Sequence, residues 1–289
     1  MPRPFQPRYD VATGLSQGAR PYQEDAIVTD FPFGSDVGLA VLSDGMGGHE
    51  AGDVASKIAV TKMYAELKLA SVNFSAKERL IPNRLIGSAA DANTLISEHI
   101  TDFPETKGMG ATLVGVVLIE NRLYWVSVGD SPLYLFRDGA LSQLNEDHSM
   151  ASQIDFMAAQ GLIEPEAAKN HPDRNSLTSA ITGEHVEKLD CPPQAYELLA
   201  GDIVLLSSDG LQYLQDENIE GLLKHNKDKS SAEIAEELLT AIETLCDPNQ
   251  DNVSFAVIRL NHAEEAQASA WSKTTTETEE AEPAKLSVG

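Results

Sequence analysis

Acidic residues recur in this chain at points where an apolar run ends or begins. Asp44 and Asp209 each follow such a run and precede a glycine, and Asp251 comes just before another run and precedes an asparagine. A single Asp-Gly pair most often makes a turn. Because the pattern recurs, and because glycine lets backbone segments approach closely, we expect these three carboxylates to share one site.

Three carboxylates packed together repel one another strongly unless a cation balances their charge. Oxygen ligands, without a cysteine or histidine cluster, favour Mg²⁺ or Mn²⁺ over Zn²⁺. We expect the strands of residues 37–43 and 203–208 to lie side by side, so that Asp44 and Asp209 meet at one end of a sheet. An antiparallel neighbour would bring Asp251, at the start of its strand, to the same end.

Arg20 lies a few residues before a pair of acids, Glu24 and Asp25. A guanidinium can hold two oxygens of a phosphate in bidentate fashion. Taken alone, this segment is equally consistent with a surface loop. Beside a metal centre, however, Arg20 becomes the expected phosphate-binding residue.

The elements that must position these residues are short strands and four longer helices. The spacing of apolar residues predicts helices over residues 50–70, 82–100, 216–225 and 231–245. Strands are expected over residues 9–15, 26–30, 37–43, 111–119, 122–128, 133–137, 140–144, 194–199, 203–208 and 253–260. Tight turns, including an Asp138-Gly139 type I′ signal, predict that the middle strands form an antiparallel meander. An α+β layered domain is indicated, because no βαβ alternation is needed.

Composition restricts the partners of the protein. With 289 residues and a net charge of −24, the chain would repel nucleic acid and anionic membrane surfaces, so neither is expected as a partner. Cys191 and Cys246 follow no metal-binding spacing and are expected to be unpaired thiols in a reducing compartment. No leader-like segment or membrane-spanning apolar run is recognisable, and we expect a cytoplasmic location.

Three regions follow one another along the chain. Residues 1–8 form an N-terminal arm, residues 9–260 the folded domain, and residues 261–289 an acidic tail. The tail is rich in Glu, Ser, Thr and Ala and is expected to be disordered. Within the domain, residues 149–175 form an insertion with two short helical stretches, which we expect to lie as a small lobe over the main sheet.

Seven short motifs occur in one order along the chain. They are Arg20-x-x-Gln23-Glu24-Asp25, Asp44-Gly45-Met46-Gly47-Gly48, Gly110-Ala111-Thr112, Val128-Gly129-Asp130-Ser131, Asp147-His148-Ser149, Ser208-Asp209-Gly210 and Asp251-Asn252. Each motif is weak alone, whereas seven in order are specific. Over about residues 9–260 the chain resembles the metal-dependent type 2C Ser/Thr protein phosphatases (the PPM family), particularly the bacterial members.

This resemblance implies an α+β fold: a four-layer αββα sandwich of two antiparallel β-sheets flanked by helices, with residues 149–175 as a small, mobile helical flap. It implies hydrolysis of phosphoserine and phosphothreonine by a water activated between two Mn²⁺ or Mg²⁺ ions, without a phospho-enzyme intermediate. The implied partners are phosphorylated proteins, with a Ser/Thr kinase as the opposing enzyme. The protein is expected to be a monomer.

The resemblance also implies which residues hold the metal ions. Asp44 would bridge both ions, and the carbonyl oxygen of Gly45 would ligate one of them. Asp209 and Asp251 would ligate the other ion. Asp130 matches the position that, together with Asp209, serves a third and weaker metal site in bacterial relatives.

Arg20, Glu24 and Asp25 are the catalytic residues that the resemblance implies. Arg20 would bind the phosphate, and the two acids would act through metal-bound waters. Met46 stands where eukaryotic members carry a histidine proposed as general acid, so protonation of the leaving group would fall to water or another group. Pro132 replaces an arginine, which removes a charge near the site and leaves the metal ligands intact.

Two other functions could use the same residues. One is a non-catalytic phosphoprotein-binding module that keeps the fold, although the complete set of acidic ligands argues against it. The other is a dimetal hydrolase of small phosphoesters. Binding of Mn²⁺ would separate a phosphatase from the first, and comparison of phosphopeptide with sugar phosphate turnover would separate it from the second.

Overall fold

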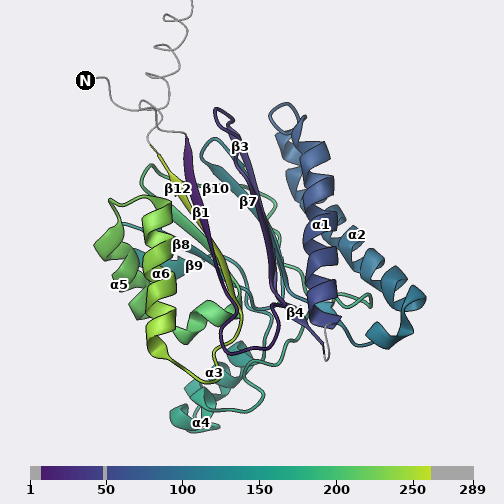
Figure 1. The fold of residues 1–289 in the computed structure, drawn as a ribbon, viewed down its shortest axis with the longest axis vertical. Coiled ribbons are helices and arrows are strands. Elements are labelled where there is room, and N and C mark those ends of the chain that lie inside the picture. Colours follow the sequence, from purple (N-terminus) through teal and green to yellow (C-terminus); the bar gives the residue numbers. More distant parts are fainter. Residues whose placement is uncertain (1–7, 48–50, 262–289) are drawn as a thin grey trace, which may run out of the picture.

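The computed structural model describes residues 8–47 and 51–261 and shows two five-stranded antiparallel sheets face to face (Figure 1). The first sheet contains, in order, β1 (Tyr9–Ser16), β12 (Val253–Leu260), β11 (Ile203–Ser207), β8 (Leu133–Arg137) and β9 (Ala140–Gln143). The second contains β10 (Tyr196–Glu197), β7 (Arg122–Val128), β6 (Leu113–Ile119), β3 (Val37–Ser43) and β2 (Ala26–Asp30). A short separate pair joins β4 (Gly45–Met46) to β5 (Gly110–Ala111).

Two helices cover the outer face of each sheet. The four helices are α1 (Ala51–Ser71), α2 (Ile81–Asp102), α5 (Asp216–Asn226) and α6 (Ser231–Leu245). The helices α1 and α2 lie on the sheet that contains β3, and α5 and α6 lie on the sheet that contains β1 (Figure 1). The predicted α+β class and the four-layer αββα sandwich are therefore confirmed.

Both faces of the central strands are buried, and this follows from their continuous apolar sequence. In β6, Val114 and Val116 pack between the two sheets, whereas Leu113 and Val117 pack beneath α1 and α2. Because side chains alternate across a strand, an unbroken apolar run can line two cores at once. These cores fix the position of one sheet relative to the other. Residues at the ends of strands from both sheets can therefore form one site.

The structure corrects two predictions about strand partners. The prediction that β3 and β11 lie side by side is wrong, because they belong to different sheets that face each other. The predicted meander is also wrong, because the chain crosses through residues 129–132 from β7 in one sheet to β8 in the other. The hairpins β6–β7 and β8–β9 do form, and Asp138 and Gly139 have the positive φ angles of a type I′ turn.

Two predicted strands differ from the structure by more than one residue at an end. The strand of residues 111–119 is divided at Thr112, whose backbone N–H donates to the carbonyl of Asp44. The strand of residues 194–199 pairs only over β10, because the N–H of Leu199 donates instead to the carboxylate of Asp202. In both places the backbone N–H bonds to a group that is not part of the neighbouring strand, so the regular pairing of the sheet stops there.

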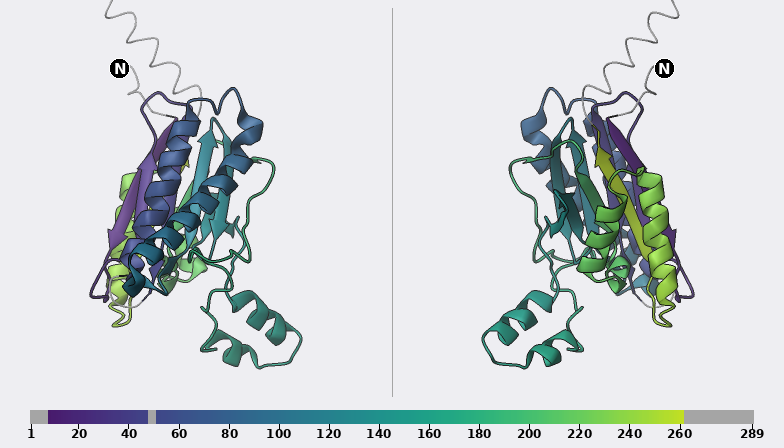
Figure 2. Two further views of the ribbon diagram at one scale, coloured as in Figure 1. Left: turned by 90° about the vertical axis from the view of Figure 1, so that its right-hand side faces the viewer. Right: turned by 90° about the vertical axis from the view of Figure 1, so that its left-hand side faces the viewer.

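A small helical flap, which is part of the predicted fold, projects from one end of the sandwich (Figure 2). It contains α3 (Ala151–Ala159) and α4 (Pro165–Lys169), which pack against each other. Its two ends meet where Ser149 pairs with Leu177. The mobility of the flap and its bounds at residues 149–175 stay predictions.

The predicted arm (residues 1–8) and acidic tail (residues 261–289) lie outside the described residues, apart from Arg8 and Asn261. Their character stays a prediction. Every helix within residues 8–47 and 51–261 is too short or too polar to cross a bilayer. Both cysteines, Cys191 and Cys246, are unpaired.

Candidate functional site

Asp44 and Asp209 come from facing sheets and meet at one end of the sandwich. Asp44 directly follows β3, and Asp209 opens the short 3₁₀ helix η3 (Asp209–Tyr213) after β11. Burial raises the pKa of Asp44 well above its usual range, and the nearby charges of Asp25 and Asp209 raise it further. Burial also raises the pKa of Asp209, and the proximity of Asp44 limits this rise. The two carboxylates come together from facing sheets, whereas the sequence predicted neighbouring strands of one sheet.

Asp251 reaches the same end because β12 pairs antiparallel with β11, as expected from the sequence. Its charge, after burial, raises the pKa of Asp209. Asp25, just before β2, is only 5% exposed, and burial raises its pKa to about 7. One oxygen of Asp25 accepts a hydrogen bond from Ser208 Oγ at 2.8 Å, and the other, Oδ1, has no partner among the described residues.

Arg20 lies on the loop between β1 and β2 at the edge of these carboxylates. Its Nη2 donates to Asp251 Oδ2 at 2.5 Å. About half of the side chain, 49%, remains exposed, so the guanidinium retains N–H groups that an anion could reach. The structure thus brings Arg20 together with the acids, and its role as the phosphate ligand stays a prediction.

Asn252 holds the loop that carries Arg20. Its side-chain oxygen accepts the N–H of Glu24 at 2.8 Å, and its amide nitrogen donates to the carbonyls of Gln17 and Tyr22 at 2.8 and 2.9 Å. One side chain therefore satisfies three backbone groups of a loop that is otherwise open to solvent. This fixes the distance between Glu24 and the start of β12.

Two glycines allow α1 to approach the end of β3 closely. A Cβ on Gly45 would lie 2.1 Å from the carbonyl oxygen of Gly52, and a Cβ on Gly52 would lie 2.5 Å from Glu24 Oε1. Any larger side chain would push the first turn of α1 away from the site. Burial also raises the pKa of Glu24. That the Gly45 carbonyl is a metal ligand stays a prediction, and Gly48 of the same motif lies outside the described residues.

Three residues that hold the site, Thr112, Ser208 and Asn252, had no predicted role although each lies in one of the seven motifs. The hydroxyl of Thr112 accepts the N–H of Asp44 at 2.9 Å and lies 2.7 Å from Ser131 Oγ. A short polar residue within or beside an apolar strand is the signal that could have drawn attention to each of them.

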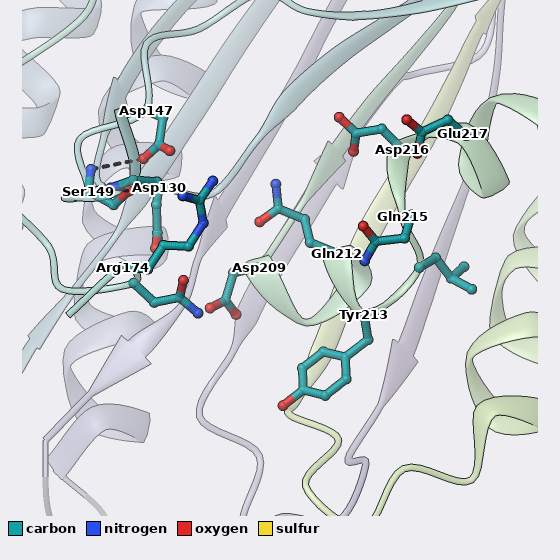
Figure 3. A pocket seen from close by; sticks show the side chains of 13 residues that line it. Asp130, Asp147, Ser149, Arg174, Asp209, Gln212, Tyr213, Gln215, Asp216 and Glu217 are labelled. Carbon is teal, nitrogen blue, oxygen red and sulfur yellow. Dashed lines mark hydrogen bonds between the residues drawn. The ribbon is translucent and has the colours of Figure 1, made fainter. Parts of the chain in front are cut away.

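A cavity of about 610 Å³ opens beside Asp130 and Asp209, between the base of the flap and η3 (Figure 3). Burial, with the charges of Asp209 and Asp147, raises the pKa of Asp130 to about 7. Arg174 is the one cationic side chain among the described residues that line the cavity. Its guanidinium donates to the two carboxylate oxygens of Asp155 at 2.6 and 2.8 Å. The cavity is thus acidic and continuous with the candidate metal ligands.

Met46 and Pro132, which depart from the family pattern, lie close to this centre. Met46 is half-buried in β4, and a Cβ on Gly110 opposite it would lie 2.9 Å from the Met46 methyl carbon. A thioether has no proton to donate, so this position offers packing without acid catalysis. The carbonyl of Pro132 accepts the N–H of Ser207 at 3.0 Å, which ties the crossover to β11.

The donor set around Asp44 fits a hard divalent cation. It consists of carboxylate oxygens, and burial raises the pKa values of Asp44, Asp25 and Asp209 among them. The unpartnered oxygen of the buried Asp25 points to a ligand that the protein itself does not supply. No three His, Cys, Asp or Glu side chains in the described ranges converge into a complete metal site. Mutual repulsion opposes such convergence until a cation balances the charge. The individual ligand roles of Asp44, Asp209, Asp251 and Asp130 stay predictions.

Comparison with known sequences agrees with the seven motifs. The family model for protein phosphatase 2C matches residues 21–257. The Ser/Thr protein phosphatase PstP of Mycobacterium tuberculosis is 36% identical over 173 residues, which are 60% of this chain and 31% of that protein. The Ser/Thr phosphatase stp of Listeria welshimeri is 31% identical over 224 residues, which are 77% of this chain and 84% of that protein.

Solved structures agree as well. The crystal structure of the Mycobacterium tuberculosis phosphatase PstP has a TM-score of 0.72 and 32% identity over 88% of this chain and 99% of that one. The PstP catalytic domain in complex with two manganese ions has a TM-score of 0.70 and 30% identity over the same shares of the two chains. With the fold, the ordered motifs and the family model all in agreement, the chain belongs to the protein phosphatase 2C family, and these relatives are bacterial, as its motifs indicate.

Proposed function

We propose that this protein hydrolyses phosphoserine and phosphothreonine in other proteins with the help of two Mn²⁺ or Mg²⁺ ions and a third, more weakly held one. The observation that carries the proposal is the convergence of Asp44, Asp209, Asp25 and Asp251 at one end of the sandwich, with Arg20 at their edge. The names of its relatives, and the two manganese ions bound by one of them, support the same activity.

The carboxylates would divide the metal ions among them. Asp44 would hold both ions of the pair, the Gly45 carbonyl one of them, and Asp209 and Asp251 the other, while Asp130 with Asp209 would hold the third. Bound in this way, the pair supplies an activated water for in-line attack on phosphorus and neutralises the phosphate charge. Locally placed cations are needed here because the protein carries a net charge of −24.

The remaining residues would bind and orient the substrate. Arg20 would hold the non-bridging phosphate oxygens as their charge develops. Glu24 and the free oxygen of Asp25 would orient waters at the metal pair. No protein side chain would become phosphorylated, and because Met46 cannot donate a proton, the leaving group would take its proton from solvent.

Finer assignments belong to the same proposal. The substrates would be phosphoproteins made by a Ser/Thr kinase, and the protein would act as a monomer. A cytoplasmic location is supported by the two unpaired cysteines. The cavity of about 610 Å³ beside Asp130 supports a protein substrate over a small phosphoester, because a phosphorylated side chain alone would leave most of this space empty.

The test is phosphate release from a phosphothreonine peptide. We expect turnover with Mn²⁺, none with EDTA, and a loss of at least about 100-fold in Asp209→Asn, since the substitution removes a metal ligand. Asp138→Asn, in the turn between β8 and β9, is the matched control and should behave like the parent. Undiminished release with EDTA or in Asp209→Asn would refute the dimetal mechanism.

Two further measurements decide between the proposal and its alternatives. Calorimetric titration that detects no Mn²⁺ binding in the millimolar range would favour a non-catalytic binding module. Turnover of a sugar phosphate that equals turnover of the phosphopeptide would favour a hydrolase of small phosphoesters.

A further inference from the structure

The crossover between the two sheets carries Asp130 and is fixed by hydrogen bonds on two sides. On the side of Asp44, Ser131 Oγ lies 2.7 Å from the Thr112 hydroxyl that holds the Asp44 backbone. On the other side, the crossover meets the side chain of a buried histidine, His148. The place of Asp130 relative to Asp44 depends on both connections.

His148 bonds to the crossover through its ring and its backbone. The N–H of Gly129 donates to His148 Nδ1 at 3.2 Å, and the N–H of His148 donates to the carbonyl of Gly129 at 3.1 Å. Gly129 has a positive φ of 102°, and a Cβ there would lie 2.7 Å from the Thr112 side chain. The residue just before Asp130 is therefore confined between Thr112 and His148.

The same histidine lies where the two ends of the flap leave the sandwich. Its carbonyl oxygen accepts both the N–H and the hydroxyl of Thr178, at 2.7 and 2.9 Å. The next residue, Ser149, pairs with Leu177, and the N–H of Met150 donates to the carbonyl of Ser176 at 2.9 Å. His148 thus connects the crossover directly to both ends of the flap.

The hydrogen-bonding atoms of the His148 ring indicate that this side chain orients the crossover and does not only fill space. The His148 side chain is 1% exposed, and because Nδ1 accepts a hydrogen bond, the neutral ring carries its hydrogen on Nε2. That Nε2 has no hydrogen-bond partner among the described residues, and the carboxylate of Glu146 is 3.8 Å away. An apolar side chain could fill the space, but only an acceptor at the place of Nδ1 satisfies the N–H of Gly129.

We propose that His148 is a positioning residue whose Nδ1 fixes Gly129, and with it Asp130, against the base of the flap. The inference rests on the proposed function, since the place of Asp130 affects hydrolysis only if Asp130 takes part in the metal site. It connects the flap to the candidate third metal site through one residue, whose ring and backbone bond to Gly129 and whose carbonyl oxygen bonds to Thr178.

The experiment compares two substitutions of nearly equal size. His148→Asn keeps an acceptor close to the place of Nδ1, and His148→Leu keeps none. Hydrogen exchange is measured on the full chain without metal, followed by calorimetric Mn²⁺ binding and steady-state hydrolysis of a phosphothreonine peptide. In His148→Leu we expect exchange about tenfold faster at residues 129–131 and 176–178, weaker Mn²⁺ binding, and kcat about tenfold lower at similar KM. His148→Asn should return each value to within about threefold of the parent.

Two further variants keep the test decisive. Asn226→Leu removes another buried polar side chain, 2% exposed, in α5 and should leave exchange at residues 129–131 unchanged. If His148→Leu does not fold, His148→Gln takes its place, because its longer side chain carries the amide towards Nε2 and away from Gly129. Equal impairment of the Asn and Gln variants, or unchanged exchange at residues 129–131 in the Leu or Gln variant, would overturn the proposal. If the parent neither binds Mn²⁺ nor releases phosphate, the proposed function fails, whereas the exchange comparison still decides the role of His148.

Discussion

Thr112 holds the backbone of Asp44 at both of its polar groups. The hydroxyl of Thr112 accepts the N–H of Asp44 at 2.9 Å, and the N–H of Thr112 donates to the carbonyl of Asp44 at 2.8 Å. Asp44 lies just beyond the last ladder pair of β3, where the sheet no longer holds it. Thr112 therefore holds the backbone from which the Asp44 carboxylate projects.

This relationship predicts the effect of Thr112→Val, which keeps the shape of the side chain and removes its oxygen. The N–H of Asp44 would lose its buried acceptor, at an expected cost of about 1–3 kcal/mol in the free energy of unfolding. The backbone that carries the Asp44 carboxylate would also be held less firmly, and we expect kcat/KM to fall about tenfold. Urea unfolding and phosphopeptide kinetics measure the two effects. Thr94→Val on the exposed face of α2 is the control, and equal losses in both variants would contradict the prediction.

Arg20→Lys should impair catalysis more than folding. The ammonium group keeps the positive charge but cannot offer two parallel N–H groups to a phosphate. We expect kcat/KM for a phosphothreonine peptide to fall about 10- to 100-fold, with little change in the melting temperature because the side chain is half exposed. The exposed Arg79→Lys serves as control. Unchanged kinetics in Arg20→Lys would show that Arg20 serves only as a partner of Asp251.

The charge of the cavity beside Asp130 predicts a preference among substrates. Asp147, Asp216 and Glu217 line it, so a phosphopeptide with Lys or Arg next to the phosphorylated residue should have a KM about three- to tenfold lower than one with Glu there. Glu217→Lys should reduce this ratio. Glu236→Lys on α6 changes the net charge equally and should not. A ratio that responds equally to both variants would assign the preference to the overall charge of the protein.

Much of the site could be predicted because its chemistry is carried by short local motifs. Asp44, Asp209 and Asp251 lie beside runs that are unmistakably apolar, and strand ends are where such residues can meet. The partners of those strands could not be predicted in the same way. A strand such as β3, apolar on both faces, is compatible with either sheet, so pairing of β3 with β11 could not be excluded from the pattern.

The supporting residues were harder to find for a different reason. Ser208, Thr112 and Asn252 bond to residues far away in the chain, such as Asp25, 183 positions from Ser208. A hydroxyl or amide side chain has ordinary roles almost anywhere in a sequence, and its partner is decided only by the assembled fold. Periodicity and turn signals describe neighbours along the chain and contain no information on such contacts.

The raised pKa values of Asp25 and Asp130 predict how stability depends on pH. Both are raised to about 7, mainly by burial, whereas an unfolded chain releases these protons near pH 4. Between these values the folded state binds more protons than the unfolded state, so the stability of the metal-free protein falls as pH rises. We expect the melting temperature in EDTA to fall by about 5–10 °C from pH 5 to pH 7.5. Scanning calorimetry at constant ionic strength measures it.

Mn²⁺ should reverse this trend, because a cation binds the ionised carboxylates of the folded state and stabilises it more as pH rises. The matched variant is Asp44→Asn, which replaces a carboxyl group buried among other acids with a neutral side chain of the same shape. It should melt at a higher temperature than the parent in EDTA at pH 7.5, gain less from Mn²⁺, and lose activity. A lower melting temperature for Asp44→Asn in EDTA would mean that the carboxylates are stabilised within the protein alone, and the charge cluster would then no longer indicate a metal centre.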